Sequence, residues 1–261
     1  MLLVTLAPMA DRDEIIAFCD ELLDAGSFDD YCPNGLQIPG ARDVISIATG
    51  VSSNLELLQA GVAARAQLLL VHHGLLWGER RGPLTEQAAA RLRVLLEPEV
   101  SLAAYHLPLD AHPEIGNNAL LRSELGLTED PRPFGEAKGR AIGAIGRAEQ
   151  PLPIAELEDR LRRATGREPL VFDSGPERIE TVGIVSGGGA FAVPEAAALG
   201  LDALVTGEPT EPVMGDAREH GINFLAGGHY ATETFGVRRL GELVAERFGL
   251  EHLFIDVPNP V

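Results

Sequence analysis

The sequence predicts an α/β fold made of two similar α/β lobes that arose by internal duplication. Three observations support this prediction. Short apolar segments typical of buried strands alternate with amphipathic segments of helical periodicity. The order helix, strand, helix, strand occurs once in each half of the chain. Finally, 261 residues with 45% hydrophobic content suffice for one large or two modest hydrophobic cores.

The first half of the chain contains the first copy of this order. Its periodicity predicts a helix over residues 11–23, a strand over 44–52, a helix over 54–66 and a strand over 67–74. Residues 101–127 continue with a strand, a turn and a helix. Strands that alternate with helices in this way favour a parallel sheet with helices on its faces.

The second half repeats the order. A helix is predicted over 153–166, a strand over 179–189, a helix over 193–200 and a strand over 201–209. Residues 222–250 then match residues 101–127 as a strand, a turn and a helix.

The boundary between the lobes is predicted in "TEDPRPFGEAKG", residues 128–139, because this segment is rich in Pro, Gly and charge and breaks both periodicities. We therefore expect a first lobe over 1–128 and a second over 129–261, and an exchange of elements between the lobes stays open.

Charge and composition exclude several classes of protein. The formal net charge of −18 repels phosphate backbones, so nucleic acid is not expected as a partner. No segment reaches the roughly 18 apolar residues of a membrane span, and no basic region precedes the apolar N-terminus. Cys19 and Cys32 have neither zinc-knuckle nor disulfide-framework spacing. We expect a cytoplasmic protein with reduced cysteines and no membrane partner.

Two adjacent histidines end the apolar strand "QLLLVHHG". Neighbouring side chains on a strand point to opposite faces, so His72 and His73 cannot both serve one ordinary core contact. A purely structural role at the strand end is the alternative to a ligand-binding role.

Two further histidines are each followed four residues later by a carboxylate, and the two pairs occupy equivalent places in the halves. They are His106 with Asp110 and His229 with Glu233. Positions four apart can approach to about 6 Å on a helix or at a strand-to-helix corner. Ligands of open α/β sheets gather beyond the carboxyl ends of strands, where all these residues are predicted to lie.

These side chains predict a two-metal site in the crevice between the lobes. Three histidines and two carboxylates exceed the three protein ligands of a typical catalytic zinc site. Carboxylates can bridge two ions about 3.5–4 Å apart, and the adjacent histidines could each hold a different ion. Nitrogen and carboxylate ligands admit zinc, iron, manganese or nickel.

Two other features have structural explanations beside functional ones. "SGGG", residues 186–189, lacks the lysine of a P-loop and the spacing of a dinucleotide fingerprint, so a tight turn is favoured over a phosphate cradle. Trp77, the only tryptophan, is predicted to anchor the core or an interface, the alternative being that it lines the active cleft.

The motifs "CPNGLQIPG", "LLLVHHGLLWGE", "AYHLPLDAHPEIGNN", "VTGE", "AGGHYATE" and "FIDVPNP" together resemble the Nif-three-like family of dinuclear metal proteins. Bacterial members of that family are often labelled GTP cyclohydrolase 1 type 2 homologues. The resemblance spans essentially the full chain. Gly74 stands where the usual family form has Pro, as in the short bacterial subgroup.

The resemblance implies a homo-hexameric toroid, built as a trimer of dimers. It also implies that two divalent metal ions are held by His72, His73, Asp110, His229 and Glu233. His106 also matches a family histidine and is expected to be an inner-cavity residue or an additional ligand. His106 and Glu208 are, by position, candidates for the general base or proton shuttle.

The implied function is metal-dependent hydrolysis of a nucleotide or a related small substrate, such as opening of the guanine ring of GTP. Two alternatives remain: a non-catalytic metal-binding or toroidal scaffold protein, and a ring acting in DNA repair. The acidic balance of the chain disfavours the DNA-repair ring.

Overall fold

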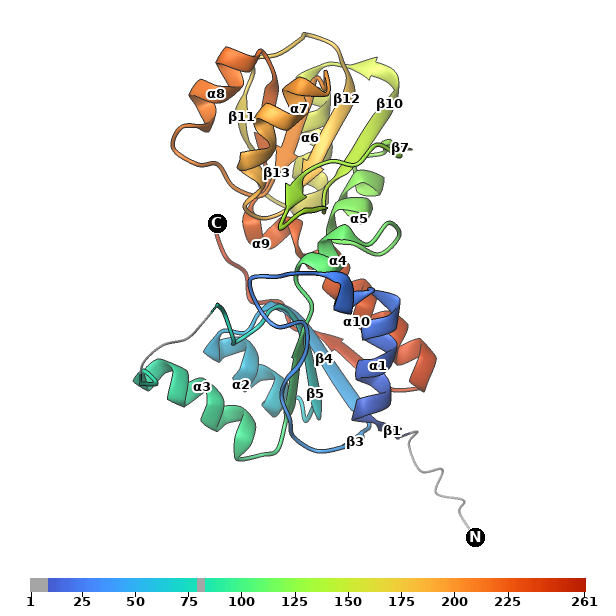
Figure 1. Cartoon of the computed structure of the whole chain (residues 1–261), viewed down its shortest axis with the longest axis vertical. Coiled ribbons are helices and arrows are strands. Elements are labelled where there is room, and N and C mark those ends of the chain that lie inside the picture. The colour runs from blue at the N-terminus through green and yellow to red at the C-terminus, as the bar shows by residue number, and fades with distance from the viewer. Residues whose placement is uncertain (1–8, 79–82) are drawn as a thin grey trace. The chain divides into compact units, whose positions relative to one another are not determined.

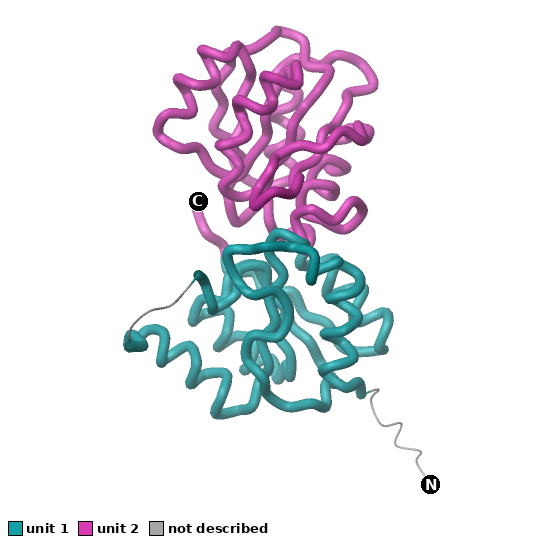
Figure 2. Tube along the Cα trace, viewed as in Figure 1, with its two compact units in different colours: residues 1–108, 237–257 teal, residues 109–236, 258–261 magenta. Residues whose placement is uncertain are grey.

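The computed structural model describes residues 9–78 and 83–261. Its contacts divide the chain into two compact units, coloured separately in Figure 2. Unit 1 comprises residues 1–108 and 237–257, and unit 2 comprises residues 109–236 and 258–261. The apolar N-terminal residues 1–8, and Glu79 at the end of the "LLLVHHGLLWGE" motif, lie outside the described residues.

Unit 1 contains a five-stranded sheet in the order β15-β4-β5-β6-β2. The first four strands are parallel, and β2 joins β6 antiparallel at the edge. The strands are β2 (Gly35–Ile38), β4 (Ser46–Ser52), β5 (Leu68–His73), β6 (Ser101–Ala104) and β15 (Glu251–Phe254). A separate short pair is formed by β1 (Ala10–Asp11) and β3 (Asp43–Val44).

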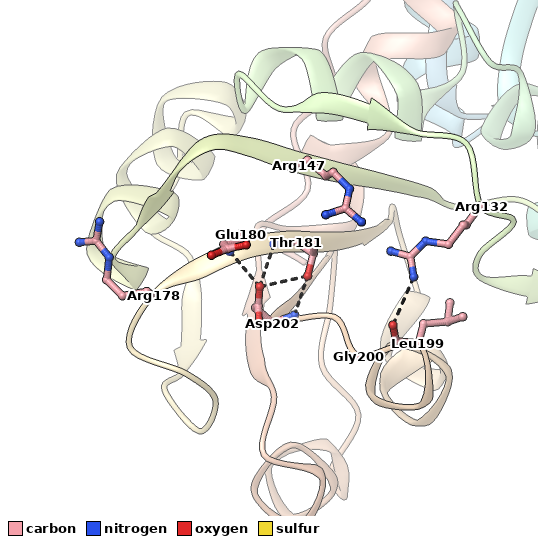
Figure 3. Close-up of a pocket in the computed structure, with 8 residues that line it drawn as sticks. All are labelled: Arg132, Arg147, Arg178, Glu180, Thr181, Leu199, Gly200 and Asp202. Carbon is pink, nitrogen blue, oxygen red and sulfur yellow. Dashed lines mark hydrogen bonds between the residues drawn. The ribbon is translucent and has the colours of Figure 1, made fainter.

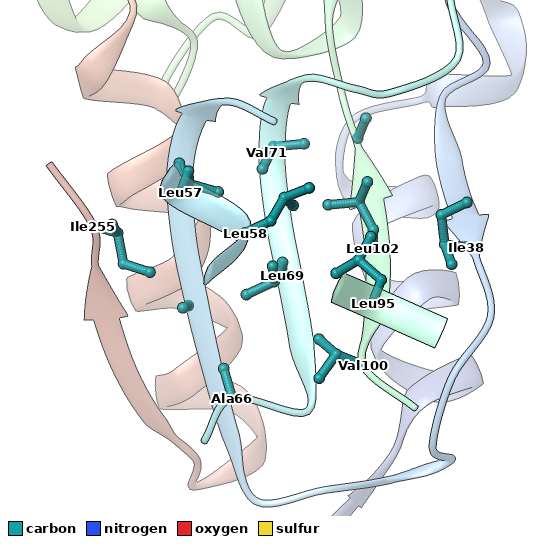
Figure 4. Close-up of a cluster of buried hydrophobic side chains, with 12 residues drawn as sticks. Ile38, Leu57, Leu58, Ala66, Leu69, Val71, Leu95, Val100, Leu102 and Ile255 are labelled. Carbon is teal, nitrogen blue, oxygen red and sulfur yellow. The ribbon is translucent and has the colours of Figure 1, made fainter. Parts of the chain in front are cut away.

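Helices cover both faces of this sheet (Figure 1). They are α1 (Arg12–Leu22), the 3₁₀ turn η1 (Ala25–Ser27), α2 (Leu55–Ala63), α3 (Glu86–Leu96) and α10 (Thr234–Phe248), of which unit 1 holds the part from Val237. Leu57 and Leu58 of α2 and Leu95 of α3 pack against Leu69 and Leu102 of the strands (Figure 4). Burial of these side chains makes the core of unit 1.

Unit 2 contains a six-stranded sheet in the order β11-β14-β13-β12-β10-β7. The central strands β12, β13 and β14 are parallel, and β11, β10 and β7 are antiparallel to their neighbours. The strands are β7 (Thr128–Asp130), β10 (Ala144–Leu152), β11 (Leu170–Phe172), β12 (Ile179–Val185), β13 (Ala203–Thr206) and β14 (Asn223–Ala226). A small hairpin consists of β8 (Glu136–Ala137) and β9 (Arg140–Ala141).

The helical segments of unit 2 are α4 (Leu107–Ala111), which begins in unit 1, α5 (Asn117–Glu124), α6 (Ile154–Thr165), η2 (Gly189–Ala192), α7 (Val193–Ala198), α8 (Val213–His220) and α9 (His229–Thr232). Leucines of α5 and α6, such as Leu121 and Leu157, pack with Val182, Ile184 and Val205 of the sheet. None of the helices in the described part of the chain is both long and apolar enough to cross a membrane.

The predicted α/β class is confirmed, with helices and strands interleaved in both units. In each unit three sequential parallel strands lie side by side, and another strand pairs antiparallel with the third. This shared order is what the repeated sequence pattern predicts, and the duplication itself stays a prediction. The antiparallel edge strands β7 and β11 were not predicted, because they are short and carry little periodicity.

Local chemistry fixes several helix ends where the sequence predicts them. Asp11 and Asn54 each accept a backbone N–H with the side chain, at the starts of α1 and α2. Thr85 does the same at the start of α3, a helix that was not predicted. The helix predicted over 153–166 is α6, which ends where Gly166 takes a left-handed φ of +70°.

The division into units differs from the predicted boundary in residues 128–139. The chain enters unit 2 after Pro108, and β7, at the start of the predicted boundary, is a paired strand of the unit 2 sheet. The C-terminal strand β15 pairs with β4 of unit 1. A strand from the second half of the sequence therefore completes the sheet of the first unit, which composition and periodicity do not reveal.

Candidate metal centre

Unit 1 gathers three histidines at the carboxyl edge of its sheet. His72 and His73 end β5, and His106 follows the neighbouring parallel strand β6 by two residues. The ring centroids of His72 and His73 are 4.7 Å apart, and that of His106 is 5.1 Å from His72 and 5.6 Å from His73. One ring nitrogen from each histidine can be chosen so that the three nitrogens all lie within 4.8 Å of one another. The rings of His72 and His73 thus approach each other at the strand end instead of diverging.

Each of these rings is held through Nδ1. Nδ1 of His72 lies 2.9 Å from the carbonyl oxygen of Tyr105, and because a carbonyl only accepts, this nitrogen donates and Nε2 carries the lone pair. Nδ1 of His73 lies 3.0 Å from Oγ of Ser52. Metal-bound imidazoles are commonly held in this way by an oxygen on the nitrogen that does not coordinate.

Asp30 holds the third histidine. Its Oδ1 lies 2.7 Å from Nδ1 of His106, and its side chain is only 2% exposed. Burial by itself would raise the pKa of Asp30, but hydrogen bonds with His106 and neighbouring groups outweigh burial and hold this pKa below its usual range. Sequence reasoning missed Asp30, since nothing in the spacing links it to a histidine 76 positions later.

Cys32 lies in the same neighbourhood. Its Sγ and single ligand atoms of Asp30 and His106 all lie within 4.8 Å of one another. Burial, reinforced by the charge of Asp30, raises the pKa of Cys32 to about 12. The thiol is therefore neutral near pH 7 and is a poor metal ligand in that form. Both cysteines have free thiols.

Unit 2 gathers carboxylates around the turn that follows β12. Oδ1 of the buried Asp110 accepts hydrogen bonds from Nδ2 of Asn117 at 2.9 Å and from Oγ of Ser186 at 3.2 Å. The next residue, Gly187, has a left-handed φ of +58°, and a Cβ there would collide with Oε1 of Glu233. Asp110 and Glu233 thus approach the same turn, whose backbone conformation and close contact require glycine.

His229 follows β14, the parallel strand on the other side of β13 from β12, and lies between two carboxylates. Its Nε2 is 3.2 Å from Oε1 of Glu233, and its Nδ1 is 3.2 Å from Oε1 of Glu208. Burial would lower the pKa of His229, but Glu233 and then Glu208 outweigh it and raise this pKa to about 9. In the absence of a cation, His229 is therefore protonated at pH 7 and neutralises part of the acidic charge around it.

Every predicted site residue lies at the carboxyl edge of the sheet in its unit. Unit 1 brings together His72, His73 and His106, while Asp110, Glu233, His229 and Glu208 surround the strand ends of unit 2. Glu208 contacts Nδ1 of His229, a position in which it orients the ring. The roles of these residues as ligands or proton carriers stay predictions.

Gly74, the residue that departs from the usual family form, has a local structural reason. A Cβ at this position would collide with the side-chain amide of Gln37. Oε1 of Gln37 accepts the N–H groups of Leu75 and Leu76 at 2.8 and 3.2 Å, and this holds the loop after the histidine pair. The glycine therefore leaves room for the side chain that fixes this loop.

A separate cavity of about 420 Å³ lies at the opposite edge of the unit 2 sheet, beside the starts of β12 and β13 (Figure 3). Three arginines line it, but Arg132 and Arg147 both bind the buried Asp130, with oxygen distances of 2.9–3.0 Å. Glu180 and Asp202 also line the cavity. Its positive charge is therefore balanced within the protein, and it does not form a cationic site.

Comparison with known proteins gives matches over nearly the whole chain. The family model of Duf34/NIF3 (NGG1p interacting factor 3) matches residues 10–260. A Pseudomonas aeruginosa protein named GTP cyclohydrolase 1 type 2 homolog is 43% identical over 246 residues, covering 94% of this chain and 97% of that protein. A Deinococcus radiodurans protein of the same name is 43% identical over 248 residues, covering 95% of this chain and 94% of that protein.

Solved structures show the same likeness. Protein ybgI, described as of unknown function, superposes with a TM-score of 0.90 at 38% identity and covers 96% of this chain and 100% of its own. A crystal structure from Thermus thermophilus gives a TM-score of 0.86 at 37% identity, with the same coverage. The matching family model and the near-complete coverage of these relatives show that the chain belongs to the Duf34/NIF3 family.

Proposed function

We propose that this chain is a metal-dependent hydrolase that binds two divalent ions. The ligands are His72, His73, Asp110, His229 and Glu233, with His106 as an inner-cavity residue or additional ligand. One observation carries the proposal: the Nδ1 atoms of His72, His73 and His106 each contact an oxygen, which supports Nε2 as the coordinating nitrogen of these rings.

The donor set fits such a centre. Five nitrogen and carboxylate ligands exceed what one catalytic zinc ion takes from a protein, and they suit zinc, iron, manganese or nickel. In unit 2, a divalent ion would replace the proton that Glu233 and Glu208 hold on His229. Asn117 and Ser186 contact Oδ1 of Asp110 and would orient this carboxylate as a metal ligand.

Divalent ions supply Lewis acidity, which polarises a substrate oxygen and makes water acidic enough to attack near neutral pH. The other steps need groups that bind, orient and carry protons. His106, held by Asp30, and Glu208, whose side chain is 35% exposed beside His229, are the candidates for moving a proton. The name shared by the relatives supports a nucleotide or related small molecule as the substrate.

Metal analysis of protein purified without chelator tests the centre itself. We expect about two divalent ions per chain and a marked loss in the double variant His72→Ala/His73→Ala. His220→Ala, which changes an exposed histidine at the end of α8, is the matched control and should keep its metal. Absence of metal from the native protein, or full occupancy in the double variant, contradicts the proposal.

Turnover tests the hydrolase assignment separately. A panel of nucleotides and cyclic amides should be hydrolysed by the metal-loaded protein and not by Asp110→Ala or Asp110→Asn. Turnover that is unchanged in both variants rules out catalysis at this site. Two bound ions without turnover of any substrate would favour the non-catalytic alternative.

From the family resemblance we also propose a homo-hexamer built as a trimer of dimers. Light scattering coupled to size exclusion measures the mass directly, against 27.8 kDa for one chain. A monomer at all concentrations contradicts this assembly.

A further inference from the structure

Trp77 lies on the loop that follows β5, and its indole is held in place while remaining 40% exposed. Its Nε1 donates to the carbonyl oxygen of Gly74 at 2.7 Å. The loop itself is fixed by Gln37, as described above, and by a hydrogen bond of 2.9 Å from the N–H of Gly78 to the carbonyl oxygen of Tyr31. The exposed indole is therefore an ordered surface.

This surface adjoins the histidine cluster of unit 1. The ring centroid of Trp77 is 5.2 Å from that of His106 and 5.8 Å from that of His73. Tyr31, 49% exposed, also adjoins the cluster, with its ring centroid 6.2 Å from that of His106. Two exposed aromatic side chains thus lie next to the same candidate ligand within one unit.

We propose that Trp77, which shares the neighbouring ring of His106 with Tyr31, forms a stacking subsite for a flat heteroaromatic ring of the nucleobase type. This inference rests on the proposed function, whose substrate class it narrows. Aromatic rings attract one another in offset-stacked or edge-to-face pairs with centroids about 4.5–7 Å apart. A ring stacked on this indole would lie beside the histidines that we propose as metal ligands.

The chemistry predicts how selective this subsite is. Stacking alone accepts any base because every base has a π-face. Guanosine, adenosine and inosine should therefore bind with similar affinity through the ring, and ribose 5-phosphate, which lacks one, should not bind there.

Trp77 is the only tryptophan of the chain, so tryptophan emission reports on this position alone. Two titrations separate the two proposals. Adding Co²⁺ to the metal-free protein should quench the emission if the ion binds the adjacent histidines. Adding guanosine to the metal-loaded protein should produce a further saturable change, after correction for absorbance with N-acetyltryptophanamide.

Three variants test the role of the ring by equilibrium dialysis with labelled guanosine. Trp77→Ala should weaken binding by about 5–150-fold, the range expected for loss of one base–aromatic stack. Trp77→Phe keeps a flat ring and should retain most of the affinity. Leu96→Ala removes a comparably exposed apolar side chain from α3 and should bind like the native protein.

The outcomes distinguish failure of the stacking subsite from failure of the proposed metal centre. Quenching by Co²⁺ without any response to nucleosides overturns the stacking subsite and leaves the metal centre standing. A nucleoside response without quenching by Co²⁺ supports the subsite and contradicts the metal centre. Equal affinities of the native protein and Trp77→Ala, with both shown to be folded by circular dichroism, overturn the inference. Emission that changes only with protein concentration also overturns it, because Trp77 would then face another copy of the chain.

Discussion

The Asp30 carboxylate offers a sharp test of how the unit 1 histidines are held. Oδ1 accepts from the N–H of Tyr31 at 2.6 Å and from Nδ1 of His106 at 2.7 Å. Oδ2 accepts from the N–H of Leu107 at 2.9 Å and from Nδ2 of Asn34 at 3.0 Å. Asp30→Asn keeps the shape but replaces one acceptor with a donor, so either orientation of the amide leaves at least one backbone N–H without its acceptor.

The magnitude follows from these contacts. Loss of the acceptor of one backbone N–H costs about 1–3 kcal/mol of folding free energy. If the amide NH₂ faces His106, the ring must accept at Nδ1 and carry its proton on Nε2, the proposed coordinating atom. Loss of an orienting partner of this kind typically weakens metal binding by about 10–100-fold.

Urea unfolding of the metal-free protein measures the first effect, and competition with a chromophoric chelator measures the second. Asp29→Asn is the matched control, because Asp29 is an exposed carboxylate that directly precedes Asp30 in the sequence. If Asp30→Asn unfolds at the same urea concentration as the native protein and binds metal equally well, the argument from the Asp30–His106 contact is refuted.

Three other features of the structure can be tested as directly. Because its pKa is about 12, Cys32 should react with iodoacetamide at pH 8 far more slowly in the native protein than after unfolding, and rapid native labelling detected by mass spectrometry would contradict this. The pKa of Asp130 is lowered to about 2, chiefly by hydrogen bonds from Arg132 that outweigh burial. Its contribution to stability is therefore complete above the unfolded pKa of about 3.9 and is lost as the pH falls from about 4 to 2. Urea unfolding should show a weaker acid dependence in Asp130→Asn, and an unchanged dependence would refute this. Gly187→Ala should lower stability by at least about 1–2 kcal/mol, since it forces alanine into a left-handed conformation and against Glu233. Gly188→Ala is its control, having negative φ and 3.7 Å of clearance from Glu208, and equal thermal stability of the two variants would contradict the prediction.

The sequence alone indicated the α/β class and most of the central elements, because both follow from local periodicity. An apolar strand such as residues 68–73 and an amphipathic helix such as residues 154–165 bear their pattern within one short segment. The same reasoning put His72, His106 and His229 at the carboxyl ends of strands, where the structure has them. Parallel neighbouring strands then bring such ends to one edge of a sheet.

The tertiary structure decided what depends on contacts between distant segments. The pairing of β15 with β4 and the contact of Asp30 with His106 join residues that no period or spacing connects. A buried carboxylate or strand edge needs hydrogen-bond partners because it has lost its contact with water. The segments that pack against it, which are distant in the sequence, supply those partners. Local pattern determines which elements form, whereas the packing of distant segments determines which side chains hold the histidines in place.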